Sequence, residues 1–196
     1  GRSGRYGIGP EALQLGVTAI AQHDFVEHAA NGLADLVSET GMTALVTVWA
    51  NEGATVVRWK RGPTPTDTAI GLGTTMPLLN SATGHVFLAW APKTAILDVA
   101  RRHMRVVARH PLGREGAPTT KSELDALIKE TRARGFATVA GNFIPGLVAV
   151  AAPILDWQGE AQAAVTLVGI DPEATRTDSK VVSQLMTFCQ ERSLAS

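Results

Sequence analysis

The sequence contains only one cysteine, Cys189, among 196 residues, so an intramolecular disulfide is excluded. Cys189 falls in the last amphipathic stretch, where we expect a buried structural thiol. No apolar segment approaches the roughly 20 residues that span a bilayer, and the N-terminal residues lack the pattern of a signal peptide. We therefore expect a globular, cytoplasmic protein that makes no membrane contact.

Net charge is also absent, because 18 basic residues balance 18 acidic ones. A domain that holds a nucleic-acid backbone by itself normally presents a basic surface. The arginines at positions 101, 102, 105 and 109 share one face of a predicted helix, but no aromatic residues interleave with them. We interpret them as a solvated face and predict that this chain alone does not bind DNA specifically.

Catalytic motifs are missing too: the sequence has no Gly-x-Ser-x-Gly elbow, no His-Glu-x-x-His pair and no phosphate-binding glycine loop. Ser81 and His85 lie four residues apart on a predicted helix, yet no orienting acid or oxyanion hole can be named for a triad. His23 and His28 lie five residues apart, whereas zinc ligands on a helix need a spacing of four. We predict no catalytic residues, no metal site and no cofactor.

What the sequence does contain is a run of strand patterns in its C-terminal half. Residues 136–140, 147–155 and 161–168 are apolar, and the last two segments are separated by the turn residues Asp156-Trp157-Gln158-Gly159. They predict a three-stranded antiparallel meander. Strands with so few polar positions must be covered by helices on at least one face.

The remaining segments supply further strands and the covering helices. Residues 42–50 and 54–59 predict a hairpin, and residues 74–78 another strand. Helices are predicted from Pro10, from an Asp24 cap to near Gly41, and over residues 81–90, 93–109, about 122–134 and about 178–192. Either Thr120 or Ser122 caps the helix that ends at Arg134. The sequence therefore predicts an α+β fold with a mostly antiparallel sheet of about six strands flanked by helices.

The junction between the strand at 74–78 and the following helix is a candidate binding site. The N-terminus of a helix offers unpaired N–H groups to a carboxylate, and Ala82, Thr83 and Gly84 are small enough to let a ligand approach. The alternative is that Ser81 only caps a helix that packs on the sheet. Both interpretations stay open at this point, and the residues by themselves favour the second.

Four short motifs, in this order, resemble the IclR family of bacterial transcriptional regulators. They are Tyr6-Gly7-Ile8-Gly9-Pro10, the segment PLLNSATGHVFLA at residues 77–89, Arg134-Gly135-Phe136-Ala137, and the segment VAAPILD at residues 150–156. The resemblance extends from Tyr6 to the last helix, and the order and spacing of the motifs make it more specific than any one of them.

The resemblance implies a domain organisation and a function. Residues 1–22 would be the remnant of a wing plus a linker helix, and residues 23–196 a GAF-like effector-binding domain. Such a domain would bind a small organic acid and signal to a winged helix-turn-helix domain that is absent from this chain, and DNA would be reached only through that domain. It would assemble as a homodimer or homotetramer. Independently, the apolar stripe of the helix from Pro10 has little of its own chain to cover it, which also predicts self-association.

The resemblance also implies which residues line the effector pocket, between the sheet and the helix that follows the Pro-Leu segment: Thr68, Met76, Ala82, Thr83, Val139, Ala149, Thr166 and Val168. The chain departs from the family where acidic residues commonly follow the Gly-Phe strand, where His85 replaces a lysine, and where Val168 replaces the hydroxyl of members that bind small polar acids. We therefore expect a less polar pocket and an aromatic or larger apolar acid as the effector.

Two alternative functions are compatible with the same fold. A dimerisation module without a ligand predicts a pocket filled by its own side chains. An enzyme on a GAF-like fold would need a reactive pair in the pocket, but the implied pocket positions are apolar or carry simple hydroxyls.

Overall fold

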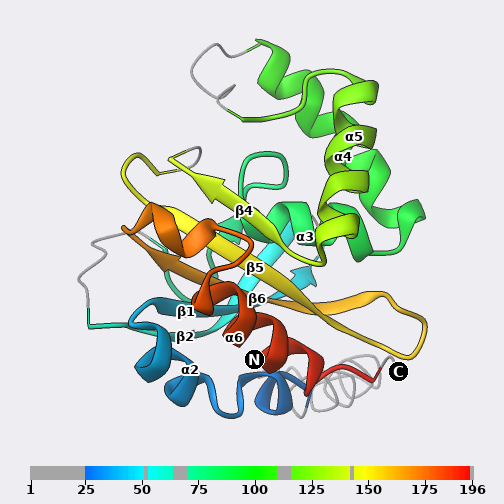
Figure 1. Cartoon of the computed structure of the whole chain (residues 1–196). Coiled ribbons are helices and arrows are strands. Elements are labelled where there is room, and N and C mark those ends of the chain that lie inside the picture. Colours follow the sequence, from blue (N-terminus) through cyan, green and yellow to red (C-terminus); the bar gives the residue numbers. More distant parts are fainter. Residues whose placement is uncertain (1–24, 51–52, 64–69, 110–115, 142–143, 195–196) are drawn as a thin grey trace, which may run out of the picture.

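The computed structural model describes residues 25–50, 53–63, 70–109, 116–141 and 144–194. Within them, six strands form one antiparallel sheet in the order β3-β2-β1-β6-β5-β4 (Figure 1). The strands are β1 (Thr43–Ala50), β2 (Gly53–Lys60), β3 (Thr75–Met76), β4 (Ala137–Ala140), β5 (Val148–Leu155) and β6 (Ala161–Gly169). The predicted fold class, an α+β protein with about six mostly antiparallel strands, is confirmed.

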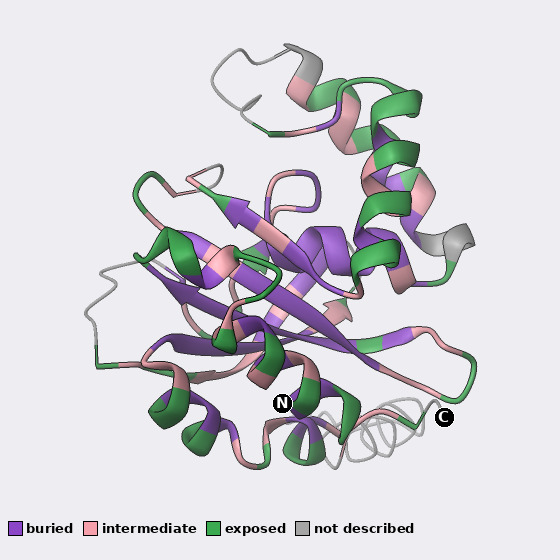
Figure 2. Ribbon diagram, viewed as in Figure 1, coloured by how far each residue is buried: buried purple, intermediate pink, exposed green. Residues whose placement is uncertain are grey.

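Helices cover both faces of this sheet. They are α2 (Leu33–Thr40), α3 (Ala82–Trp90), α4 (Lys93–Arg109), α5 (Lys121–Arg134) and α6 (Lys180–Gln190), with residues 25–30 also helical and a short 3-10 helix η2 (Pro172–Thr175). α2 and α6 lie on one face, and α3 lies on the other with α4 and α5 packed against it (Figure 1). As a result, most residues of the strands and of α3 are buried, whereas α4 and α5 each keep a wide exposed face (Figure 2).

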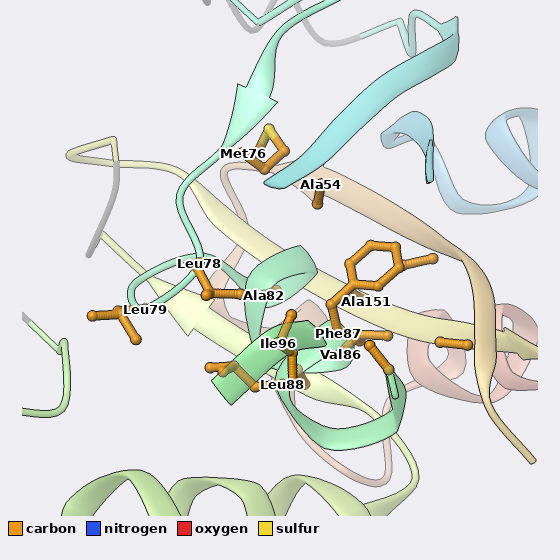
Figure 3. Packing of buried hydrophobic residues seen from close by; sticks show 14 of the residues in the cluster. Ala54, Met76, Leu78, Leu79, Ala82, Val86, Phe87, Leu88, Ile96 and Ala151 are labelled. Atoms are coloured by element: carbon orange, nitrogen blue, oxygen red, sulfur yellow. The ribbon is translucent and has the colours of Figure 1, made fainter. Parts of the chain in front are cut away.

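The strands serve two separate apolar cores because their side chains alternate between the faces. In β5, Val150 and Ile154 join the core beneath α2 and α6, whereas Ala151 joins the core beneath α3. Figure 3 shows the second core, in which Phe87 of α3 lies among residues from the strands and from α4. The near-continuous apolar character of β5 and β6 therefore reflects a sheet that is covered on both sides.

Several predicted elements match the structure closely. The helices predicted over 81–90 and 93–109 are α3 and α4, and Thr120 is the cap of α5, with a complete capping box between Thr120 and Glu123. Cys189 is buried under the sheet, and burial raises the pKa of its thiol to about 12. The prediction that Cys189 is a buried structural thiol is therefore confirmed.

Two predictions about secondary structure were wrong. The single helix predicted from Asp24 to Gly41 is broken at Asn31-Gly32, where Gly32 adopts a left-handed φ of 76° and Arg192 donates hydrogen bonds to the Asn31 carbonyl. The strand predicted over 74–78 shrinks to Thr75–Met76, because Pro77 has no N–H to continue the ladder. The helix predicted over about 178–192 is confirmed as α6, which starts at Lys180 behind a Ser179 cap, and the short helix η2 before it was not predicted.

The predictions for residues 1–22, which include the wing remnant and the linker helix, lie outside the described residues. The turn Asn51-Glu52 of the first hairpin also lies outside them. In the described part of the chain, no helix combines the length and the apolarity that crossing a membrane requires.

Candidate functional site

The sheet register brings three predicted pocket residues into one row. Val139 of β4 pairs with Ala149 of β5, and Ala149 pairs with Val168 of β6. Thr166 lies two residues before Val168 and therefore points to the same face. This is the face that α3 covers, so all four side chains lie between the sheet and α3.

The N-terminus of α3 is held in place by a compact set of polar contacts. The Ser81 hydroxyl accepts a hydrogen bond from the Gly84 N–H at 3.0 Å and donates to the Pro77 carbonyl at 2.5 Å. His85 Nε2 lies 2.9 Å from the Leu79 carbonyl oxygen, and burial lowers the pKa of this histidine although the hydrogen bond acts in the opposite direction. The structure confirms Ser81 as the predicted N-cap of α3.

Gly84 is required by close packing within the same turn. A Cβ at this position would lie 2.3 Å from the Leu78 carbonyl oxygen and 2.4 Å from that of Pro77. Both contacts are with backbone atoms that cannot rotate away. The segment that precedes α3 is thus folded tightly against the first turn of the helix, and it forms a fixed wall beside the sheet.

Two buried hydroxyls connect α3 to the sheet. Thr83 Oγ1 and Thr166 Oγ1 are 2.7 Å apart, and both residues are almost completely shielded from solvent. The two groups carry two protons, and the hydrogen bond between them uses one. Within the described residues neither oxygen makes a second hydrogen bond. One hydroxyl proton therefore remains for an additional acceptor.

A cavity lies at this point, with a volume of about 30 Å³. Seven of the eight predicted pocket residues line it: Met76, Ala82, Thr83, Val139, Ala149, Thr166 and Val168. The eighth, Thr68, lies outside the described residues. Met76 comes from β3 at one edge of the sheet and Val139 from β4 at the other, so the sheet curls around the N-terminus of α3.

Five further residues line the cavity and were not predicted: Ile70, Ser81, Ile144, Leu147 and Val148. Ile144 and Leu147 flank Pro145-Gly146, and large apolar residues beside a turn are a signal of burial that the sequence already contained. None of the described lining residues carries a formal charge. This cavity is apolar except for the hydroxyls of Ser81, Thr83 and Thr166.

The arrangement offers no catalytic pair in its described part. The Ser81 hydroxyl is engaged by Pro77 and Gly84, and His85 bonds to the Leu79 carbonyl, so the two side chains are not joined as nucleophile and base. No group of three or more metal-ligating side chains is found among the described residues.

Residues 17–193 match the family described as Bacterial transcriptional regulator IclR C-terminal. The chain belongs to this family. The resemblance to IclR regulators is thereby confirmed, and the chain is an effector-binding domain of an IclR-family transcriptional regulator. Family membership fits the curled antiparallel sheet flanked by helices, which is the GAF-like fold of IclR C-terminal domains.

Relatives of known name agree with this assignment. The glycerol operon regulatory protein of Streptomyces coelicolor is 26% identical over 169 residues, which are 85% of this chain and 63% of that protein. The protein of the same name from Streptomyces griseus is 26% identical over 190 residues, 96% of this chain and 71% of that protein. This chain therefore spans less than two thirds of the first relative's length.

Solved structures of the family superimpose over nearly the whole chain. Pseudomonas aeruginosa HmgR has a TM-score of 0.74 at 28% identity, covering 98% of this chain and 75% of that one. Thermotoga maritima IclR has a TM-score of 0.76 at 21% identity, covering 100% of this chain and 78% of that one. At the latter identity the similarity shows the fold alone.

Proposed function

We propose that this IclR-family domain binds an apolar or aromatic organic acid in the cavity between α3 and the sheet. In this proposal the bound acid changes the position of α3 and thereby signals to a DNA-binding domain outside these residues. The proposed role is regulatory and assigns no catalytic step to the described residues. The observation that carries the proposal is the cavity lining, which is uncharged and apolar apart from three hydroxyls.

The acidic group of the ligand has specific partners in this proposal. One proton of the Thr83–Thr166 pair has no acceptor among the described residues, and a carboxylate oxygen supplies one. Ser81 satisfies the Gly84 N–H, which leaves the N–H groups of Ala82 and Thr83 in the first turn without an intrahelical acceptor. The positive end of the helix dipole favours an anion at the same place.

The size of the cavity requires that the site opens when a ligand binds. A volume of about 30 Å³ has room for water but not for an aromatic ring. Met76 can make way because its unbranched thioether has several rotamers. α3 also packs on α4 and α5, so a displacement of α3 by the ligand would move these helices as well. This coupling is the proposed route of the signal.

A ligand-free dimerisation module is the second candidate, and one observation favours it. That function predicts a pocket filled by its own side chains, and the small volume fits this prediction. It assigns no role to the unused hydroxyl proton of Thr83 and Thr166. The two candidates therefore differ in a simple result, namely whether any small organic acid binds at this site.

Calorimetric titration with benzoate, phenylacetate and octanoate tests the proposal. We expect at least one of these acids to bind to the unaltered domain and none to bind to Val168→Asp. The new carboxylate would be buried in the row of apolar residues without a partner, and it would repel the acid. Binding by no acid in a broader panel of aromatic and aliphatic acids would leave the dimerisation module as the function.

A matched variant separates loss of the site from loss of the fold. Val168→Thr keeps the branched shape of the side chain and adds only a hydroxyl, so it should fold and retain the acid with a modestly lower affinity. The circular dichroism of both variants should match that of the unaltered domain. Unchanged affinity in a folded Val168→Asp protein would mean that the acid binds elsewhere.

A further inference from the structure

Another and larger hollow lies between α4 and α5, and none of its lining residues lines the cavity beside Thr83. Its volume is about 560 Å³, which is within the usual range for small-molecule sites of roughly 300 to 1,000 Å³. We call it the α4–α5 groove and define it by its floor: Leu88, Ile96, Leu97, Met104, Leu124 and Ile128. This inference does not depend on the proposed function.

The groove exists because of how the three helices pack. α4 and α5 both pack on α3 (Figure 1), and the hollow between them is lined by Leu88 of α3 together with residues of both helices. Leu88, Ile96 and Leu124 are buried, and Leu97, Met104 and Ile128 are half-buried. A floor of this kind is able to accept an apolar body.

The rim of the groove is cationic. Four basic side chains and one acidic side chain line it: Arg101, Lys121, Lys129, Arg132 and Asp125. Arg101 is already paired with Asp98 at 3.0 Å. Among the described residues, neither Lys121 nor Lys129 takes part in an ion pair. The rim therefore has positive charge that the described residues do not neutralise, although the chain as a whole is neutral.

One end of the rim is organised for an anion. Lys129 and Arg132 are three residues apart on α5, so their side chains are neighbours on the helix surface. Arg132 Nε donates a hydrogen bond to the Ala89 carbonyl at 2.5 Å, which anchors the guanidinium at the end of α3 and leaves its other N–H groups available. A fixed arginine beside an unpaired lysine is a suitable partner for a carboxylate or sulfonate.

We propose that the α4–α5 groove is a binding site for an amphipathic organic anion. The apolar body of the ligand lies on Met104, Leu124 and Ile128, and its acidic group contacts Lys129 and Arg132. The site is separate from the cavity beside Thr83, but both adjoin α3. A ligand in the groove would therefore hold α4 and α5 apart and influence the same helix that covers the cavity.

The fluorescent probe 1-anilinonaphthalene-8-sulfonate combines aromatic rings with a sulfonate and can test this proposal on the whole chain. We expect saturable fluorescence enhancement that octanoate reverses and acetate does not, because acetate lacks the apolar body. Lys129→Glu should lower the affinity for the probe about fivefold, the size of one partly exposed charge interaction. Asp125→Asn should raise this affinity about twofold, because Asp125 lies one helical turn from Lys129 and its negative charge opposes the anion.

Lys180→Glu is the matched control, since it makes the same charge change at an exposed position at the start of α6, on the opposite face of the sheet. Its affinity for the probe should stay within about twofold of the unaltered chain. An equal loss of probe affinity in Lys129→Glu and Lys180→Glu would show a nonspecific charge effect and overturn the proposal. Fluorescence per chain that falls as the protein concentration rises would show that a second copy covers the groove, and would overturn it as well.

Discussion

The two faces of the sheet differ in what they bury. Beneath α2 and α6, the buried side chains that the described strands contribute are all apolar, and they pack with the Cys189 thiol. Beneath α3 the sheet also buries hydroxyls, because Thr43, Thr47 and Thr166 lie in register with residues of that face. The cavity lies on this second face. One face of the sheet is therefore packed with apolar side chains, and the other carries the hydroxyls and the cavity where we propose that the ligand binds.

The difference follows from small changes of residue type at alternating positions. In β6, Val165 and Leu167 point to the α6 side, whereas Thr166 and Val168 point to the α3 side. A shift of one residue in register would exchange these two sets completely. The apolar face fixes the register by burial, and this register places Thr166 opposite Thr83.

The largest effect on stability is expected for Leu185→Ala in α6. Leu185 is completely buried, so its truncation should lower the free energy of unfolding by about 3 kcal/mol. The affinity for an organic acid should not change, because this residue is on the opposite face from the cavity. Urea unfolding measures the change in stability, and calorimetry measures the affinity for the acid. A stability loss below about 1 kcal/mol, or a clear loss of affinity, would contradict the different roles of the two faces.

Gly84→Ala should have the next largest effect, on the α3 face. The new methyl group would overlap the Pro77 and Leu78 carbonyl oxygens, so the turn must shift at a cost of about 2 kcal/mol. Gly71→Ala is the matched control, since nothing lies within 4 Å of a Cβ there, and it should change stability by no more than about 0.5 kcal/mol. Thermal unfolding of both variants would show the difference, and similar melting temperatures would contradict the close packing.

Thr83→Val should affect recognition more than stability. It removes one of the two hydroxyls that the proposed acid contacts, and the affinity should fall by about 1 to 2 kcal/mol, or roughly tenfold. Thr138→Val makes the same replacement on β4 at a position that points away from Val139 and the cavity. Calorimetry should find its affinity unchanged. Equal affinities in both variants would show that the Thr83 hydroxyl does not contact the acid.

The smallest effect concerns pH and His85. Burial lowers the pKa of folded His85 below its unfolded value near 6.5, so on acidification the unfolded chain takes up this proton first. Below about pH 6.5 the free energy of unfolding should therefore fall as the pH falls, by at most about 1.4 kcal/mol per pH unit, until the folded pKa is reached. His85→Gln should lack this component in urea unfolding between pH 7 and 5. Identical pH profiles would show that His85 does not contribute.

Much of the fold could be predicted from the sequence, because its strands and helices carry strong local signals. The apolar runs predicted β5 and β6, and Thr120 was one of two predicted caps for the helix that ends at Arg134; the structure confirms these elements and the Thr120 cap. The break at Gly32 could not be predicted, because it depends on hydrogen bonds from Arg192, which is 161 residues from Asn31 along the chain. Long-range contacts of this kind leave no local pattern.

The site was predicted in a different way. Resemblance to a family supplied the residues, and the strand register explains why Val139, Ala149 and Val168 come together. The bond between Thr83 and Thr166 was not predicted, because it joins residues 83 positions apart on a helix and a strand. The small volume was not predicted either, since it depends on how Met76, Ile144 and Leu147 fill the space.

Methyl NMR during titration with benzoate, phenylacetate or octanoate would show directly which face of the sheet contacts the acid. We predict that chemical-shift changes occur first and are largest at the methyl groups of Met76, Val139, Ala149 and Val168. Methyl groups of Val150, Leu167 and Leu185 on the opposite face should change little. Changes centred on the α2 and α6 face, with the cavity residues unaffected, would contradict the assignment of recognition to the α3 face.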